Sequence, residues 1–156
     1  MPTSTRFAVA IHILSGIALH RGEVVRSEDL ARSVNTNPTT VRRLLGDLAA
    51  AGMTRAQMGQ GGGALLAKPA SKITLLDIYR AVEDAQPFAL HRSKPDPTCY
   101  VGRYIIPVLE DEFGGLTKAL EKTLAATTLA DVVRKVEAKA GFTFIPPGWE
   151  GATGPI

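Results

Sequence analysis

Residues 35–52 read NTNPTTVRRLLGDLAAAG, a stretch with clear signals for the start, the inner face and the end of a helix. Asn37 is a strong N-cap residue and Pro38 suits the first helical position. Gly52 is a natural C-terminal stop. One face is apolar, formed by Val41, Leu44, Leu45 and Leu48. The stretch therefore predicts a helix that begins at Pro38 and packs one face on a core.

Two further helices are predicted upstream. The first covers Thr5–His20, where apolar residues recur at helical spacing. The second starts at EDLARSV, with Ser27 as N-cap and with Glu28 and Asp29 near the positive end of the helix dipole. It ends near Asn35, so a short turn joins it to the helix at Pro38, as in a helix–turn–helix unit.

The spacing becomes strand-like after this unit. MTRAQM and ALLAK flank the turn sequence GQGGG, which predicts a β-hairpin over residues 53–68. Thr74 then caps a helix with the sequence LLDIYRAVED. The order helix–helix–helix–hairpin–helix over residues 1–83 predicts a mainly α fold with a small β-hairpin, a winged helix–turn–helix domain.

The second half of the chain predicts a loop and two more helices. Residues 84–98 contain three prolines and no periodicity. Pro107 marks either the true start of the following long helix or a kink in it. Thr128 caps a closing helix that runs to about Lys139. A long apolar stripe marks the long helix and consists of Ile105, Leu109, Phe113, Leu116, Leu120 and Leu124.

We expect four segments: the winged helix–turn–helix domain at 1–83, the loop at 84–98, the long helix with its closing helix at 99–140, and a tail at 141–156. Charge is divided along the chain. Residues 1–72 carry nine Lys/Arg and four Asp/Glu, whereas residues 73–156 carry nine and eleven. A basic half joined to a slightly acidic half suits a polyanion-binding module with a separate assembly segment.

Composition narrows the class of protein. Apolar residues make up 45% of the 156 residues, enough for a sizeable core. No apolar run is long enough to span a membrane, and His12 interrupts the apolar start, which argues against a signal peptide. The single cysteine, Cys99, suits a reducing compartment. We therefore expect a cytoplasmic protein.

The polar face of the helix at Pro38 is the main candidate for a binding site. It carries Thr39, Thr40, Arg42 and Arg43. Residues in the first turns of a recognition helix contact base edges, and arginine suits guanine or phosphate. The alternative is an ordinary solvated helix face. The neighbouring helix and the hairpin favour DNA contact.

Other chemistry has weaker support. GQGGGA matches a dinucleotide-binding turn, but that site needs a helix after the glycines, and LLAKP follows instead. His12, His20 and His91 are scattered and form no metal pattern. No nucleophile–base signature is present, so we predict neither a catalytic residue nor a cofactor or metal, and an enzyme is the least favoured alternative.

Several motifs resemble those of the Rrf2 family of winged-helix regulators, which includes the iron–sulfur-cluster regulator, the nitric-oxide-sensing repressor and the cysteine-metabolism repressor. They are NTNPTTVRRLLGDLAAAG, GQGGGALLAKP, ITLLDIYRAVED, CYVGRYIIPVLEDEF and TTLADVV. The resemblance implies a homodimer that pairs through the long helix, whose apolar stripe is the candidate interface, and whose hairpins reach DNA. Family hairpins often carry arginine before the first glycine, where this chain has Met58.

The full set of expected DNA contacts is Thr36, Asn37, Thr39, Thr40, Arg42, Arg43, Arg55, Gln57, Gln60, Gly61 and Gly62. Cluster-binding members of the family carry three grouped cysteines before the long helix. This chain has only Cys99, so we expect no iron–sulfur cluster. Cys99 is either a redox sensor at a helix start or a small packing residue at the dimer interface.

The sequence thus predicts a homodimeric, sequence-specific transcriptional regulator, a repressor responding to an unidentified signal, that binds double-stranded DNA at a near-palindromic operator. The alternative is a protein-interaction module that does not bind DNA specifically.

Overall fold

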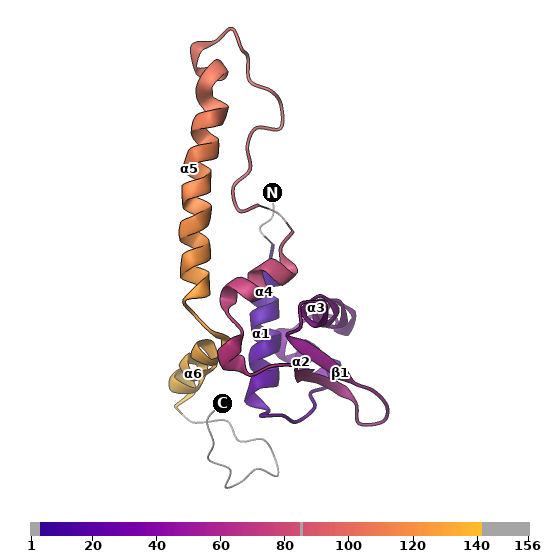
Figure 1. The fold of residues 1–156 in the computed structure, drawn as a ribbon. Helices are drawn as coiled ribbons and strands as arrows, with labels where there is room; N and C mark the ends of the chain where they lie inside the picture. Colours follow the sequence, from indigo (N-terminus) through magenta and orange to yellow (C-terminus); the bar gives the residue numbers. More distant parts are fainter. Residues whose placement is uncertain (1–3, 85, 142–156) are drawn as a thin grey trace.

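The protein, a computed structural model described over residues 4–84 and 86–141, has a helical body with a small hairpin and one long projecting helix (Figure 1). The elements in chain order are α1 (Arg6–Leu19), α2 (Ser27–Val34), α3 (Pro38–Ala50), β1 (Thr54–Gln57), β2 (Gly63–Leu66), the 3₁₀ turn η1 (Ala70–Lys72), α4 (Leu75–Val82), α5 (Tyr100–Ala125) and α6 (Leu129–Ala140). The predicted order of helices and hairpin is confirmed, whereas η1 was not predicted.

The start of α3 follows its sequence signals. The side-chain oxygen of Asn37 accepts a hydrogen bond from the Thr39 N–H at 2.7 Å, and Pro38 is the first helical residue. Gly52 follows the helix with φ of 74°, a left-handed conformation that glycine adopts without strain.

The predicted cap of α2 is wrong by one residue. Arg26, not Ser27, is the N-cap, and its carbonyl accepts the N–H groups of Asp29 and Leu30. The cause is tertiary: Val25 exchanges two backbone hydrogen bonds with Ala64 of β2, at 3.0 and 2.8 Å. This pairing holds the chain in extended form just before the helix and so determines where the helix begins.

The hairpin is a two-stranded antiparallel sheet in which Thr54 pairs with Leu66 and Gln57 pairs with Gly63. It lies tightly against the segment before α2. A Cβ atom on Gly63 would lie 2.4 Å from the carbonyl oxygen of Val25, so only glycine fits there.

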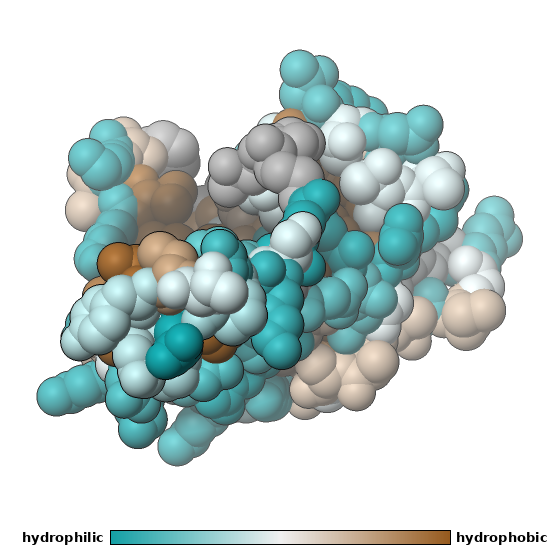
Figure 2. Space-filling view, turned by 90° about the horizontal axis from the view of Figure 1, so that it is seen from above, coloured by the Kyte–Doolittle hydropathy of each residue, from teal (hydrophilic) through white to brown (hydrophobic). Residues whose placement is uncertain are grey.

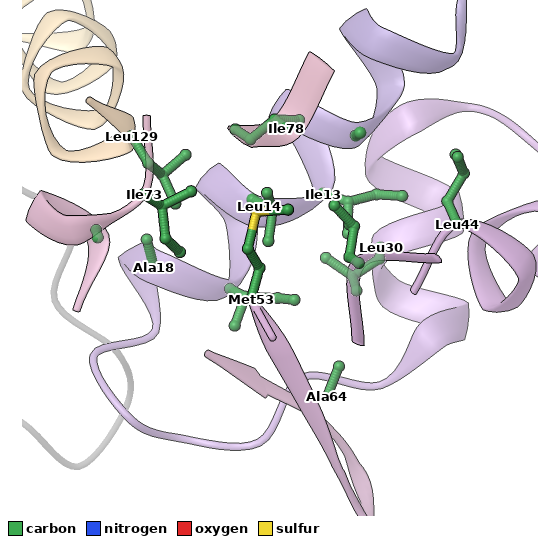
Figure 3. Close-up of a cluster of buried hydrophobic side chains, with 14 of the residues drawn as sticks. Ile13, Leu14, Ala18, Leu30, Leu44, Met53, Ala64, Ile73, Ile78 and Leu129 are labelled. Carbon is green, nitrogen blue, oxygen red and sulfur yellow. The ribbon is translucent and has the colours of Figure 1, made fainter. Parts of the chain in front are cut away.

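The hydrophobic core lies around α1 and takes residues from every helix except α5 (Figure 3). Ile13 and Leu14 of α1 are fully buried, and Met53, which follows α3, points toward Leu14. On α3, Val41, Leu44 and Leu48 are buried and Leu45 is half-buried, as its apolar face predicted. Leu129, Ala130 and Val133 bring α6 into the same core.

The starts of α4 and α6 are joined. Thr74 and Thr128 each form a capping box with the aspartate three residues on, Asp77 and Asp131, so both predicted caps are confirmed. The two threonines also pair across an antiparallel bridge. The Leu75 N–H donates to the Thr127 carbonyl at 2.9 Å, and the Leu129 N–H donates to the Ile73 carbonyl at 2.8 Å. This junction fixes the C-terminal end of α5 to the body.

Helix α5 stands away from the body, with the preceding loop beside it (Figure 1). It continues through Pro107, so of the two interpretations of that proline the helix start is wrong. None of its 26 residues is buried. Five members of the predicted stripe are half-buried, and one is exposed: Ile105, Leu109, Phe113, Leu120 and Leu124 are half-buried, whereas Leu116 is exposed.

The loop and α4 account for part of that coverage. The ring of Phe88 lies 5.6 Å from the ring of Phe113, and Arg80 of α4 forms an ion pair with Glu121 at 3.0 Å. Within the described residues, no helix is long and apolar enough to cross a membrane. Of the predicted tail, residues 142–156 lie outside the described part of the chain.

Candidate nucleic-acid interface

Helix α3 and the β1–β2 hairpin project from the side of the body opposite α6 (Figure 1). Burial of the apolar face of α3 turns its other side to solvent, where Thr39, Thr40, Arg42 and Arg43 are all exposed. Ahead of the helix, Thr36 is half-buried and Asn37 is exposed, with its oxygen engaged in the cap. The candidate residues of the helix therefore lie at one accessible surface.

The hairpin presents a polar, glycine-rich tip. Arg55, Gln57, Gln60 and Gly61 are exposed, whereas Gly62 is half-buried. A Cβ on Gly62 would lie 2.2 Å from the carbonyl oxygen of Gln57, so the tip closes this tightly only with glycine. A strand follows the glycines, and no helix N-terminus is available to hold a pyrophosphate. The dinucleotide-binding alternative is therefore wrong.

A groove of about 390 Å³ separates α3 from the hairpin. Its walls come from the start of α2, the outer side of α3 and both strands. The α3 side includes the small residues Gly46 and Ala49, and two arginines, Arg42 and Arg55, are among the lining residues. This groove of the protein can accept the phosphate backbone of one DNA strand. The helix would then lie in the DNA groove on one side of that backbone, and the hairpin in the DNA groove on the other side.

The two neighbouring arginines of α3 differ in their partners. Arg42 donates from Nη2 to Oε1 of Glu28 at 2.6 Å, whereas Arg43 has no acidic partner among the described residues. The pKa of the Glu28 carboxyl is lowered by its own backbone N–H and then by Arg42. Arg43 is thus the freer cation on the surface of α3.

Sequence reasoning missed Glu28 as a residue of this surface. It was interpreted as an ordinary acidic residue near a helix N-terminus, and nothing local distinguishes it from Asp29. Its partner lies 14 residues further on. Only the crossing of α2 over α3 brings the two together.

The exposed apolar side chains of α5 form a second surface. Tyr100, Val101, Tyr104, Val108 and Leu116 are all exposed, and the rings of Tyr100 and Tyr104 lie 5.4 Å apart. Seen from above, hydrophobic surface appears around the α5 column among hydrophilic residues (Figure 2). By the 100° step of a helix, Tyr100, Tyr104 and Val108 are offset from the half-buried part of the predicted stripe, whereas Leu116 lies in line with it.

Cys99 is the N-cap residue of α5 and is exposed. The backbone N–H groups of Gly102 and Val101 lower the pKa of its thiol. Arg103, four residues further on, donates from Nε to the carbonyl of Pro97 at 3.0 Å. Throughout residues 4–84 and 86–141, no three His, Cys, Asp or Glu side chains gather to hold a metal ion. A lone thiol does not fit a cluster that needs grouped thiolates.

Comparison with known proteins agrees with this geometry. Residues 3–135 match the Rrf2 family, described as iron-dependent transcriptional regulators. YwnA of Bacillus subtilis, which carries the name of an HTH-type transcriptional regulator, is 42% identical over 131 residues, covering 83% of this chain and 96% of YwnA.

Two solved structures share the fold at lower identity. IscR of T. potens is 22% identical with a TM-score of 0.67, over 89% of this chain and 90% of IscR. CymR, the global cysteine regulator of B. subtilis, is 21% identical with a TM-score of 0.64, over 86% of this chain and 98% of CymR. The family match and YwnA support a helix–turn–helix transcriptional regulator, and the two solved structures share its winged-helix fold. The chain belongs to the Rrf2 family of transcriptional regulators.

Proposed function

We propose that this regulator binds a near-palindromic operator as a homodimer and represses transcription until a signal alters the dimer. Each protomer places α3 in the major groove and its hairpin beside the adjacent phosphate strand. Two such helices related by a two-fold axis reach half-sites about 34 Å apart. Because DNA is the target, we expect the protein to act in the cytoplasm.

The observation that carries the proposal is the shared surface of α3 and the hairpin. Exposed threonines and arginines on α3 lie beside a groove that also carries Arg55 and Gln57 of β1. A merely solvated helix face needs no such groove and no glycine-rich tip beside it. The alternative of a protein-interaction module without specific DNA binding leaves this surface unused.

We assign different roles to the two arginines. Consecutive residues are about 100° apart on a helix, so Arg42 and Arg43 face different directions. Thr39 and Arg43, four residues apart, form one ridge that can enter the major groove. Arg42 lines the groove beside the hairpin and faces the path of the phosphate strand.

Dimerisation is assigned to α5. The helix is about 39 Å long by its 26 residues, and its exposed apolar face has nothing to cover it within the described chain. A second copy offers an equal face, and two-fold pairing is the commonest oligomeric arrangement. Of the stripe expected from the sequence, Leu116 is the exposed member and is available to a partner. The other five residues of the stripe remain candidates for the dimer interface only where the partner extends beyond the loop before α5.

Regulation cannot use the grouped thiolates of cluster-binding relatives, because the donor set of this chain does not fit that group. We expect the signal to act where the dimer helix meets the body, at the Arg80–Glu121 ion pair and the bridge between Thr74 and Thr128. Changes there would alter the relative placement of the two recognition helices.

The test is selection of bound sequences from a random DNA pool, followed by competition against an unrelated duplex. The proposal predicts enrichment of a symmetric site and a relaxed preference at one base position in Arg43→Ala. Binding that is equal for all sequences would contradict it and favour a scaffold role.

A further inference from the structure

Glu28 places a negative charge on the surface assigned to DNA. Its carboxylate and Arg42 both line the groove between α3 and the hairpin, and Ser27 donates to the same carboxylate at 3.3 Å. Arg26 lies 3.9 Å from it as well. The carboxylate is therefore held in position on one wall of the groove.

This charge is unusual for its surroundings. Arg43 and Arg55, the other cations of the surface, have no acidic partner among the described residues. Asp29, the next residue along, pairs with Arg32 at 3.4 Å on its own helix and does not line the groove. Within the described part of the chain, Glu28 is the one acid that pairs with an arginine of the groove.

A phosphate and Glu28 compete for the same guanidinium. Both are anions that prefer the paired N–H donors of arginine. A phosphate that approaches Arg42 must displace the carboxylate or share the guanidinium with it, and it meets the repulsion of a like charge. An arginine that is already paired also releases fewer counterions from DNA, so it contributes less to the salt dependence of binding.

We propose that Glu28 is a positioning residue that competes with DNA phosphate for Arg42 and thereby keeps sequence-independent binding weak. The inference rests on the proposed function, since it needs the groove to receive a phosphate strand. Contacts by Thr39 and Arg43 to uncharged base acceptors are not opposed in this way. Sequence preference therefore persists while the general attraction to DNA is limited.

The experiment measures the affinity of the full chain for a random-sequence duplex at several salt concentrations. Glu28→Gln should bind more tightly and steepen the slope of log affinity against log salt by about one unit. With a slope steeper by one unit, a fourfold dilution of salt raises the affinity of the variant about fourfold more than it raises that of the wild type. Asp29→Asn is the matched control, because it removes the same charge one residue away and should leave the slope unchanged.

A second background separates pairing from simple repulsion. In Arg42→Gln, the additional change Glu28→Gln should no longer steepen the slope, since the groove guanidinium that Glu28 pairs with is gone and Arg26, 3.9 Å from Glu28, does not line the groove. A full-sized slope change in that background would overturn the proposal and assign Glu28 a purely repulsive role. Thermal melting of each variant shows that the protein is folded where affinity is measured.

The outcomes also separate this inference from the function beneath it. Failure of the wild type to bind any duplex would contradict the proposed function, and the inference with it. Wild-type binding together with equal slopes for Glu28→Gln and Asp29→Asn would overturn the inference alone.

Discussion

The body and the long helix α5 differ in the burial of their apolar side chains. In the body, α1 to α4 and α6 bury leucine, isoleucine and valine side chains to a few per cent exposure or less. In α5 no residue is buried, and Tyr100, Tyr104 and Val108 are more than half exposed. Most of the body's large apolar side chains are thus covered by the same chain, whereas α5 leaves an apolar face exposed, the face proposed above for the second copy.

The path of the chain sharpens this contrast. It leaves the body after α4, runs outward along the loop before α5, and returns along α5 to the same core, where Leu129 of α6 is fully buried (Figure 1). Both ends of the excursion are thus fixed to the DNA-binding body. A partner that moves α5 acts directly on the placement of α3.

The largest expected effect is on the core. Leu129→Ala should lower the free energy of unfolding by roughly 2–5 kcal/mol, because it leaves a cavity beside α1. Met58→Ala, at the exposed hairpin tip, is the control and should change it by less than about 0.5 kcal/mol. Urea unfolding measures both. Equal effects would mean that α6 does not belong to the core of the body.

The next effect concerns the α5 surface. Replacing both Val108 and Leu116 with lysine should weaken dimerisation by about 100-fold or more, because each loses roughly 1.5–3 kcal/mol of apolar burial. Sedimentation should show monomers at micromolar concentration. Glu110→Lys on another side of α5 is the control. An unchanged dimer in the double variant would place the interface elsewhere.

A smaller effect distinguishes the two arginines. Arg43→Ala should cost roughly 1–3 kcal/mol on the selected operator and relax preference at one base position. Arg42→Ala should change operator and random duplex in parallel. Fluorescence anisotropy titrations on both DNAs measure this. The role assignment is reversed if Arg42→Ala is the variant that loses sequence preference.

About 1 kcal/mol of the free energy of unfolding is expected to depend on the helix cap at the junction between the body and α5. Thr128→Ala removes a capping box and should destabilise the protein by about that amount at neutral pH. The Thr128 backbone N–H and hydroxyl lower the pKa of Asp131, so the stability it contributes is present above its unfolded pKa and is lost on acidification.

Wild-type stability should therefore fall more steeply than that of Thr128→Ala as the pH drops below about 4. Denaturant titrations at several pH values test this difference. Parallel pH profiles would show that the cap does not hold Asp131 in its charged form.

The smallest effect is at Cys99. Because its side chain is exposed, Cys99→Ser should alter the free energy of unfolding by less than about 0.5 kcal/mol. If the thiol is a redox sensor, oxidant weakens operator binding in the wild type and not in Cys99→Ser. Identical responses of the two proteins would rule the sensor out.

The same two regions show how far the sequence alone could lead. Element order, the Asn37 cap, the threonine caps and the buried face of α3 followed from local chemistry. The start of α2 did not, because the pairing of Val25 with Ala64 overrides the local preference of Ser27. The Glu28–Arg42 pair and the join between Thr74 and Thr128 depend on elements far apart in the chain.

The α5 stripe shows a different limit. Periodicity identified an apolar helix but could not tell which apolar residues the same chain covers. Phe88 of the loop and helix α4 cover part of the stripe, and nothing in the sequence of that loop or of α4 indicates this contact. The face left for a partner therefore had to be found from exposure.

The spacing of the half-sites tests the central claim most directly. In a dimer held by α5, the two α3 helices read half-sites at a fixed rotation about the duplex. Inserting five base pairs at the centre of the selected operator turns one half-site by about half a helical turn. The account predicts that affinity falls to the level of random DNA. Unchanged affinity for the extended operator would contradict a rigid dimer that reads DNA through paired α3 helices.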